Sequence, residues 1–367
     1  MKIFIDDKGR YKSNNGYGNL SRNIGLALNI AGCDVFYDET KSKPWDTSLT
    51  ENKILSFENS INYGRYQDCD VALTISPPTE RKILDIPNLI YTQNALDGLK
   101  EEWGIFCSKY DGVIVPGDFD KRDFMLWNSN TYVCPQIIDN KLFQNRPKWR
   151  DEGSEKFTFI FIGSLSYRKG VDLLLESFGR FSKIDNNSSK LVMICPGAKN
   201  INFLLNKIRN VNPYSDVDLY IEDLSQEWIC RYINRADVFV SLSRGEGWCM
   251  PVFESILCEK PVLVPKSTAM SEATPNNSVI KIDTSVVPVR TTEDEFAKGF
   301  RNQYGEKHIA SYDVDIVSAI KAFKEIKDNY GHYKANTLES REFVLSNYSH
   351  KNVGIRLKEV LLEVIGS

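Results

Sequence analysis

The sequence predicts an α/β protein with two doubly wound parallel-sheet domains. Short apolar runs of strand length alternate along the chain with longer runs whose apolar residues recur at helical spacing. The order of strand, helix and strand favours parallel sheets. The alternating series occurs twice, on either side of a polar segment, and 367 residues is a length for two domains.

The first half begins with a strand and a helix. The apolar run KIFI predicts a buried strand, which leads into the polar, glycine-containing segment of residues 6–19. Apolar residues at helical spacing from Leu20 to Ala31, followed by Gly32, predict the first helix. Further strands are predicted in this half at CDVFYD, DVALTIS, NLIYTQ and DGVIVPG.

The second half follows a polar segment. Residues 139–156 contain a proline and show no periodicity, so we expect them to link the domains. Strands are predicted beyond them at FTFIFIGS, KLVMICPG, VDLYIED, ADVFVSLS and KPVLVPK, and residues 336–367 are predicted to be helical. We therefore expect an N-terminal domain at residues 1–148, a C-terminal domain at residues 149–340 and a C-terminal helix at residues 341–367.

Composition narrows the class of protein. Hydrophobic residues make up 42% and charged residues 26%, which is typical of a soluble globular protein, and a net charge of -3 argues against a protein-wide basic field for nucleic acid. No apolar run approaches the ~20 residues of a membrane span, and the start MKIFIDDKGRYK becomes charged too early for a signal peptide. Eight cysteines without a C-x-x-C pair predict reduced core thiols, hence a cytoplasmic protein or a viral protein made in a host cytoplasm. The three histidines lie at position 308 and beyond, which argues against a histidine zinc site.

The loop in FIGSLSYRKGVDLLLESF follows a predicted strand that ends at Gly163. A helix is predicted to begin near Gly170, so Arg168 and Lys169 lie at its N-terminal end. The N-terminus of a helix attracts anions, and two adjacent cations strengthen that attraction. The segment therefore predicts a clamp for a diphosphate, and the alternative is a solvated basic turn.

Two glutamates in SRGEGWCMPVFESIL follow another predicted strand. Glu246 lies at the carboxyl end of that strand, between glycines that permit a tight turn. Pro251 suits the first position of a helix, which puts Glu254 in its first turn. We expect both carboxylates to be ionised there and to accept hydrogen bonds from sugar or ribose hydroxyls. The alternative is a surface glutamate and a capping glutamate.

Gly16 and Gly18 are predicted to lie between the first strand and the first helix. Glycines there would let the backbone approach a phosphate or a sugar. The G-x-G-x-x-G fingerprint is incomplete because Ser21 occupies the third glycine position, so a dinucleotide site is weakly supported and a flexible loop is the alternative.

Three D-x-D strings, which bind metals in some sugar transferases, are interpreted as turns and caps. Asp68–Asp70 and Asp216–Asp218 precede predicted strands, and Asp313–Asp315 lies beside a predicted helix start. We expect no metal at any of them.

Together these segments resemble the GT-B-fold glycosyltransferases, most closely the retaining enzymes of glycosyltransferase family 4, over nearly the whole chain. SLSRGEGWCMPVFESILCEKPVLVP is similar to the family's E-x7-E block through Glu246 and Glu254, and FIGSLSYRKGVDLLLESF to its phosphate-clamp block through Lys169. WICRYINRADVFVSLS, YDGVIVPGDFDKRDF and YVCPQIIDNKLF resemble further segments of the family. The resemblance implies two Rossmann-like domains with a cleft between them and a final helix that crosses back to the N-terminal domain.

The resemblance also implies a reaction and roles for residues. A sugar would move with retention from a UDP- or GDP-linked donor to a glycan or lipid-linked acceptor, without a metal or other cofactor. Glu246 would face the transferred sugar, Glu254 the ribose, and Lys169 with Arg168 the leaving diphosphate. Further donor contacts would come from Gly16, Gly18, Gly163, Ser164, Asp223, Leu224, Gly247, Trp248, Cys249, Met250 and Pro251.

The sequence departs from the family at two positions. Ser164 stands where members carry an arginine after the glycine, and Arg168 is our candidate to replace that charge. Many members carry a histidine near the sugar in the N-terminal domain, where this chain offers Gln93, Asn94 or Asp97, and we take Asn94 as the candidate. An amide cannot act as a base at neutral pH. In the front-face mechanism proposed for the family, the leaving phosphate itself takes the acceptor proton.

Two alternatives follow from the departures and from the basic segment KGRYKSNNGYGN. The acceptor could be a modified base in phage or viral DNA, in which case DNA binding would weaken steeply with salt. The chain could also be an inactive homologue that binds a sugar nucleotide without turnover.

Overall fold

The computed structural model describes residues 1–13, 15–38, 44–46, 49, 51–79, 82–149, 156–198, 201–291 and 295–366. The chain forms two compact units. The first contains residues 1–95, 99–139 and 345–367, and the second contains residues 96–98 and 140–344. Each unit is described by itself below.

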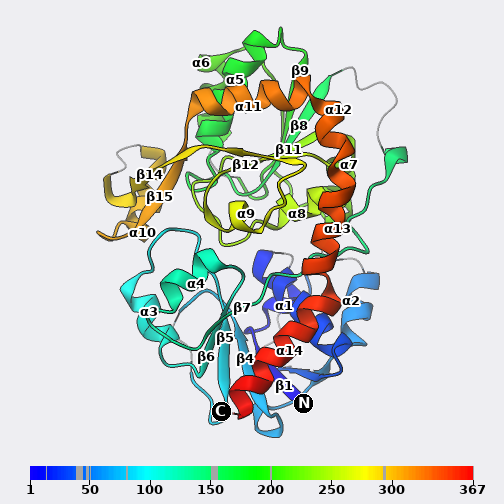
Figure 1. Ribbon diagram of the computed structural model, residues 1–367, viewed down its shortest axis with the longest axis vertical. Helices are drawn as coiled ribbons and strands as arrows, with labels where there is room; N and C mark the ends of the chain where they lie inside the picture. The colour runs from blue at the N-terminus through cyan, green and yellow to red at the C-terminus, as the bar shows by residue number, and fades with distance from the viewer. Residues whose placement is uncertain are drawn as a thin grey trace. The chain divides into compact units, whose positions relative to one another are not determined.

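The first unit is built on a parallel sheet with strand order β3-β2-β1-β4-β5-β6-β7 (Figure 1). Its strands are β1 (Lys2–Asp6), β2 (Asp34–Tyr37), β3 (Asn62–Tyr63), β4 (Val71–Ile75), β5 (Asn88–Tyr91), β6 (Gly112–Val115) and β7 (Thr131–Val133). Its helices are α1 (Gly16–Ile30), α2 (Glu51–Glu58), α3 (Glu101–Cys107), α4 (Asp118–Phe124) and α14 (His350–Gly366), with 3-10 turns η1 (Arg10–Lys12) and η3 (Tyr66–Asp68).

Helices α1 and α14 pack side by side in the first unit, although they come from opposite ends of the chain (Figure 1). Their apolar faces share one core with β1, β2 and β4, in which Ile24 and Leu28 of α1 meet Leu357 and Leu361 of α14. A Cβ atom at Gly354 would overlap the carbonyl oxygen of Ala27, so glycine is needed where the helices approach most closely.

The second unit is built on a parallel sheet with strand order β10-β9-β8-β11-β12-β13. Its strands are β8 (Phe157–Ile162), β9 (Ser189–Ile194), β10 (Asp216–Tyr220), β11 (Val238–Val240), β12 (Val262–Pro265) and β13 (Val279–Ile282), and β14 (Thr284–Pro288) pairs with β15 (Ala310–Val314) in an antiparallel ribbon. Its helices are α5 (Val171–Ile184), α6 (Ile201–Val211), α7 (Gln226–Arg235), α8 (Met250–Leu257), α9 (Thr268–Ala273), α10 (Lys298–Tyr304), α11 (Ile316–Asp328) and α12 (Tyr330–Ala335), with 3-10 turns η4 (Pro147–Trp149), η5 (Val289–Thr291) and η6 (Glu295–Ala297). Helix α13 (Thr337–Tyr348) carries the chain back into the first unit.

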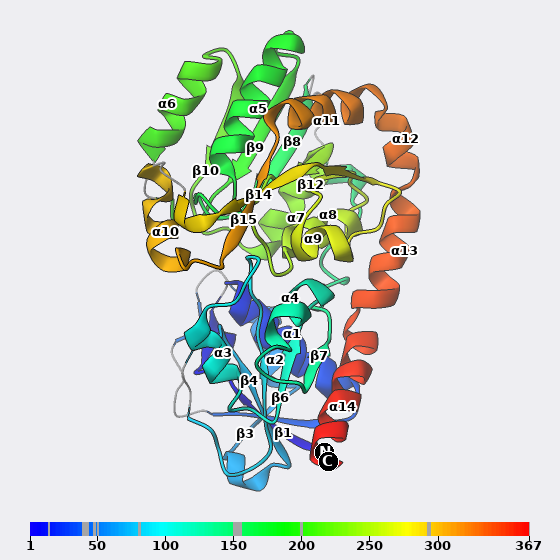
Figure 2. The same ribbon diagram turned by 60° about the vertical axis from the view of Figure 1, so that its left-hand side comes forward.

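Aromatic side chains fill the core between the second sheet and two of its helices. Phe159 of β8 lies against Phe178 and Phe181 of α5 and Phe323 of α11, with ring centroids 4.9–6.1 Å from that of Phe159. Such tilted aromatic contacts add specific geometry to apolar burial. At another edge of the unit, β14, β15 and α10 lie together (Figure 2).

The predicted fold class is confirmed, because both halves contain parallel sheets with helices between their strands. Each predicted strand segment contains an observed strand, and the predicted C-terminal helical stretch is α13 and α14 within the described residues. The first helix begins earlier than predicted, at Gly16. The pattern did not reveal β13 or the β14–β15 ribbon.

The predicted linker is wrong over residues 140–149, which belong to the second unit. The side chain of Asn234 in α7 holds this segment: its Nδ2 donates to the carbonyl of Gln144 (3.1 Å), and its Oδ1 accepts from the N–H of Arg146 (2.6 Å). The boundary therefore falls at residues 139/140, not 148/149, and a second boundary falls at residues 344/345, not 340/341. Residues 150–155 of the predicted linker lie outside the described residues.

All eight cysteines are buried free thiols. In the described part of the chain, no helix combines the length and the apolar character needed to cross a membrane.

Candidate active site

Each sheet has one point where the strand order reverses. In the first unit it lies between β1 and β4, and in the second unit between β8 and β11. Ligands of open parallel sheets bind beyond the carboxyl ends of the strands at such points. In the second unit, the loops after β8 and β11 are the ones that carry Arg168, Lys169 and Glu246.

These three side chains form one cluster. Nζ of Lys169 lies 2.5 Å from Oε1 of Glu246, and Nη1 of Arg168 lies 3.1 Å from Oε2 of the same carboxylate. Arg168 also donates to the carbonyl of Gly245 (2.6 Å). The sequence predicted all three residues for one site, but it gave them separate partners, whereas the structure pairs both cations with Glu246.

Burial and charge oppose each other at Glu246. Burial by itself would raise the pKa of this carboxyl group, but the charges of Lys169 and Arg168 outweigh burial and lower the pKa to about 2. The predicted ionised state therefore agrees with the structure, although the cause is the two cations. One carboxylate faces two cations, so the cluster carries excess positive charge that suits a further anion.

The chain enters α5 through a glycine that no other residue could replace without movement. Gly170 has φ 64°, and a Cβ atom there would overlap the carbonyl oxygen of Leu242 in the loop after β11. The two loops are also joined by hydrogen bonds: the N–H of Arg244 and the hydroxyl of Ser243 both donate to the carbonyl of Arg168, at 2.7 and 3.0 Å. Backbone contacts thus fix the distance between the cations and Glu246.

Arg244 anchors the same loop from below, a role that sequence reasoning missed. Its guanidinium binds both carboxylate oxygens of Asp172 (2.7 Å each) and Oδ1 of Asp313 (2.5 Å), and it lies 3.6 Å from the ring centre of Tyr167. A buried arginine with two carboxylates and an aromatic face is held rigidly. In the sequence it is one more charged residue beside Glu246, because its partners lie 69 and 72 residues away.

Glu254 lies deeper than predicted. Helix α8 begins at Met250, so Pro251 is its second residue and Glu254 its fifth, which is one turn beyond the predicted first turn. The Glu254 side chain is buried. At the start of the helix Cys249 has φ 75°, a left-handed conformation that costs free energy for a residue other than glycine, and strain of this kind is common at functional sites.

The remaining predicted donor contacts of the second unit lie at the carboxyl ends of neighbouring strands. Gly163 and Ser164 follow β8, and Asp223 and Leu224 follow β10. Trp248 is buried against Phe253, with ring centroids 4.7 Å apart. Gly247 and Cys249 are also buried, whereas Ser164 and Asp223 are exposed. Their contact with a donor stays a prediction.

The prediction for Gly16 and Gly18 needs correction. They are the first and third residues of α1, not parts of a loop before it, and the N–H of Gly18 is already bound to Oδ1 of Asn15 (2.9 Å). Gly18 is needed because a Cβ atom would overlap the carbonyl oxygen of Ser13. The helix cap therefore uses the Gly18 N–H that we expected to approach a ligand.

Asn94 of the first unit is buried after β5, where its N–H donates to Oδ1 of Asp120 (3.0 Å). Gln93 accepts a hydrogen bond from Gln136 (2.6 Å). Asp97 belongs instead to the second unit, where its N–H donates to the carbonyl of Ala310 and its carboxylate accepts from Tyr312. The predicted group of three is thus divided between the units.

The D-x-D strings carry structural contacts. Asp315 caps α11 by accepting from the N–H of Ser318 (2.7 Å), as predicted, and Asp313 binds Arg244. Asp216 and Asp218 lie within β10, not before it, and both pair with Lys190.

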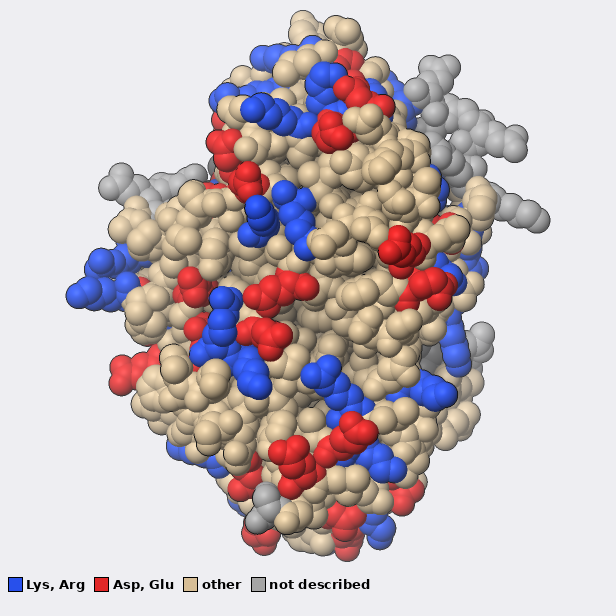
Figure 3. Space-filling model, viewed as in Figure 1, with Lys and Arg blue, Asp and Glu red and all other residues tan. Residues whose placement is uncertain are grey.

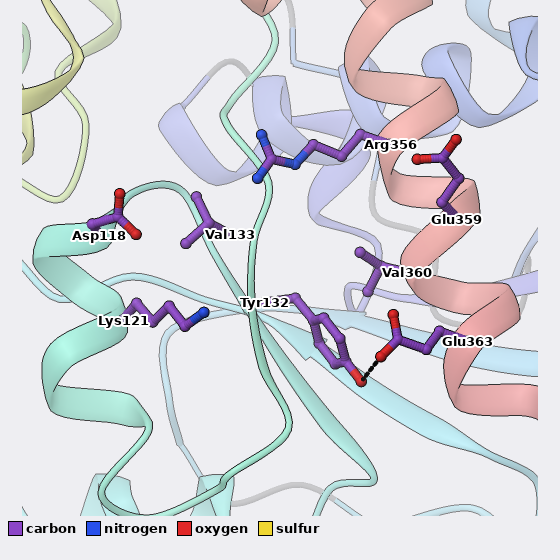
Figure 4. A pocket seen from close by; sticks show the side chains of 8 residues that line it. All are labelled: Asp118, Lys121, Tyr132, Val133, Arg356, Glu359, Val360 and Glu363. Atoms are coloured by element: carbon purple, nitrogen blue, oxygen red, sulfur yellow. Dashed lines mark hydrogen bonds between the residues drawn. The ribbon is translucent and has the colours of Figure 1, made fainter. Parts of the chain in front are cut away.

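The first unit has a pocket of about 370 Å³ between α4, β7 and α14 (Figure 4). Lys121 and Arg356 reach into it from opposite sides, and Tyr132 on its floor donates to Glu363 (3.2 Å). Both signs of charge line it, as both signs are mixed across the molecular face of Figure 3. This pocket lies at the sheet edge formed by β7, away from the reversal of strand order between β1 and β4.

Comparisons with known proteins agree with this architecture. The fold is that of the GT-B glycosyltransferases: the Anabaena protein HepE, solved with UDP and glucose, superposes with a TM-score of 0.69 at 12% identity, over 99% of this chain and 100% of that one. Residues 144–302, which contain the cluster of Arg168, Lys169 and Glu246, match the family model described as Glycosyl transferases group 1. The chain therefore belongs to the GT-B glycosyltransferase superfamily, as the sequence resemblance predicted.

Two curated proteins are similar in sequence. An uncharacterised protein of Sulfolobus islandicus rod-shaped virus 1 is 25% identical over 279 residues, which is 74% of this chain and 70% of that protein. The human phosphatidylinositol N-acetylglucosaminyltransferase contains a polypeptide that is 24% identical over 154 residues, which is 42% of this chain and 31% of that polypeptide.

Proposed function

We propose that this glycosyltransferase moves a sugar, with retention, from a UDP- or GDP-linked donor to a hydroxyl of a glycan or lipid-linked acceptor. The observation that supports this most is the cluster of Lys169 and Arg168 around Glu246 at the reversal point of the second sheet. Two similar proteins support the same chemistry: HepE was solved with UDP and glucose, and the human protein is named as part of an N-acetylglucosaminyltransferase.

In this proposal the cluster binds the donor diphosphate. Glu246 holds the Lys169 ammonium and the Arg168 guanidinium in place before the donor arrives, so little reorganisation is needed when phosphate oxygens approach. The bond between the sugar C1 and the phosphate oxygen breaks, and a bond from C1 to the acceptor oxygen forms on the same face. The acceptor proton passes to the leaving phosphate oxygen, and the two cations stabilise its growing charge.

The glutamates keep the separate roles that we proposed for them. Both oxygens of Glu246 already accept a hydrogen bond, but a carboxylate has about four lone-pair sites, so it can also accept from a sugar hydroxyl. Glu254 would accept from the ribose hydroxyls once the donor enters. Asn94 would donate to the sugar from the first unit, as an orienting group and not as a base.

Metal independence is part of the proposal. The cluster supplies positive charge that other transferases obtain from a divalent cation. Activity is therefore expected to persist in EDTA, and loss of activity in EDTA that added Mg²⁺ or Mn²⁺ restores would contradict this step.

The full chain should be incubated with a panel of UDP- and GDP-sugars and candidate acceptors, and release of nucleoside diphosphate measured. Release that depends on an acceptor, with retained anomeric configuration in the product by NMR, is the expected result. Thermal-shift screening against the free nucleotides identifies the base first, because a ligand that binds the folded state raises the Tm. Donor binding without turnover on any acceptor would instead indicate an inactive homologue.

A further inference from the structure

A second cationic pocket lies at the reversal point of the first sheet. It has a volume of about 290 Å³ and forms after β1, where the 3-10 turn η1 precedes α1. Its lining residues are Lys8, Gly9, Arg10, Lys12, Ser13, Asn15, Pro44 and Asp46. Three cations thus face one carboxylate in a position that matches, sheet for sheet, that of the cluster after β8.

The loop that carries the cations is held from below by a buried carboxylate. Asp7 is buried and accepts from the N–H of Gly9 (2.8 Å), the N–H of Tyr11 (2.7 Å) and the hydroxyl of Ser21 (2.6 Å). Lys8 and Gly9 both adopt left-handed backbone conformations, with φ of 56° and 73°. A tight, hydrogen-bonded turn of this kind fixes the direction in which neighbouring side chains leave it.

A buried arginine fixes the far end of the same loop. Arg22 of α1 is buried and donates to the carbonyls of Tyr11 and Ser13. Tyr11 is in turn packed among aromatic rings, including Tyr37 and Phe57 at centroid distances of 4.8 and 5.6 Å. The pocket is therefore preformed, which lowers the entropic cost of binding a ligand.

Arg10 has unused capacity to donate. Its Nη1 atom is buried and has no hydrogen-bond partner among the described residues, and its guanidinium lies 5.8 Å from the ring centre of Tyr17. Lys12 lies over the rings of Tyr11 and Trp45, at 5.7 and 5.6 Å from their centres. A buried guanidinium nitrogen without an acceptor costs free energy, which an anion in the pocket would recover.

Asp46 does not neutralise the pocket. It is one carboxylate against three cations, and it also stabilises the charge of the buried Arg22. The remaining excess of positive charge suits a phosphate group, whose oxygens can accept from both a guanidinium and an ammonium.

We propose that Arg10, Lys12 and Lys8 bind a phosphate ester carried by the acceptor. The inference rests on the proposed function: the donor has one diphosphate, which the cluster of the second unit binds, so the cations of the first unit serve a different anion. The acceptor would therefore be a phosphorylated molecule, either free in solution or part of a lipid headgroup.

Calorimetry on the full chain tests the site with inorganic phosphate as the probe. Arg10→Ala and Lys12→Ala are each expected to weaken phosphate binding about tenfold or more. Lys109→Ala, which removes an exposed cation of the same unit outside the pocket, is the matched control and should leave phosphate binding within about twofold. Arg10→Lys, which keeps the charge, should retain most of the affinity, and an unchanged Tm separates loss of the site from loss of the fold.

Competition separates this pocket from the donor site. Saturating UDP should leave the binding that depends on Arg10 and Lys12 unchanged, and its loss would assign these cations to the donor and overturn the proposal. Equal phosphate affinity in all variants would also overturn it. If UDP does not bind at all, the proposed function fails, but the variants still decide whether the pocket binds phosphate.

Two further arms identify the source of the phosphate. Binding to phosphatidylcholine vesicles that contain phosphatidic acid, but not to phosphatidylcholine alone, supports a lipid headgroup when Arg10→Ala abolishes it. Phosphate binding without vesicle binding supports a soluble phosphate ester. Duplex DNA that binds through Arg10 and Lys12 and displaces phosphate would overturn the assignment in favour of a nucleic-acid acceptor, with the steep salt dependence that such binding shows.

Discussion

The loops after β1 and after β8 occupy equivalent places in the two sheets, yet they treat their cations differently. After β8, Lys169 and Arg168 are paired with Glu246, which the neighbouring loop after β11 supplies. After β1, the carboxylate at the core of the turn is Asp7, which binds backbone N–H groups and leaves the cations to line a pocket. A paired cluster has fixed geometry before the ligand arrives, as catalysis requires, whereas unmatched cations favour binding.

The largest expected effect concerns the paired cluster. Lys169→Ala should lower kcat/KM for donor turnover by about 10²–10³-fold, because one donor to the developing charge is lost. Lys183→Ala, which removes an exposed lysine near the end of α5, is the control and should retain activity. Comparable activity in the two variants, measured as nucleoside diphosphate release in EDTA, would place the catalytic site elsewhere.

The second effect is a pH dependence of stability. The pKa of Glu246 is about 2 in the folded protein, below its ordinary value of 4.5, so its charge contributes stability that is fully present above about pH 4.5 and is lost as the pH falls toward 2. Glu246→Gln should lose about 3 kcal/mol of the free energy of unfolding at neutral pH and show a smaller decrease between pH 5 and pH 2. Urea unfolding across this range measures both, and parallel pH curves for the two proteins would contradict the paired arrangement.

Glycine substitutions compare the two loops directly. Gly18→Ala and Gly170→Ala should each cost about 2 kcal/mol or more of the free energy of unfolding, because the added Cβ would overlap a backbone carbonyl oxygen in both cases. Gly16→Ala is the matched control: nothing lies within 4 Å of its Cβ position, so the change should stay within about 0.5 kcal/mol. If Gly18→Ala were as mild as Gly16→Ala in urea unfolding, the close approach of α1 to residues 10–13 would be wrong.

The sequence predicted the strand ends of this site better than its contacts. Apolar runs and the glycines beside Glu246 located the loops after β8 and β11, because these patterns depend on local backbone geometry. The pairing of Glu246 with Lys169 depends on side-chain direction across 77 residues, which no local pattern contains. The same holds for Arg244 and Asp172, whose bond requires the relative positions of two loops. The antiparallel β14–β15 ribbon was missed because α10 and two 3-10 turns separate two short strands.

The smallest effect sharpens the division of work within α8. Glu254→Gln keeps the size of the buried side chain and removes its charge, so it should raise KM for the donor about tenfold with a smaller change in kcat, as expected for lost hydrogen bonds to ribose. The same substitution at Glu246 should lower kcat as well, because it alters the cations that stabilise the leaving group. Donor titrations of both variants at saturating acceptor measure the two parameters. Since Glu254 lies one turn deeper than the sequence predicted, an unchanged KM in Glu254→Gln would mean that it braces α8 and does not contact the donor.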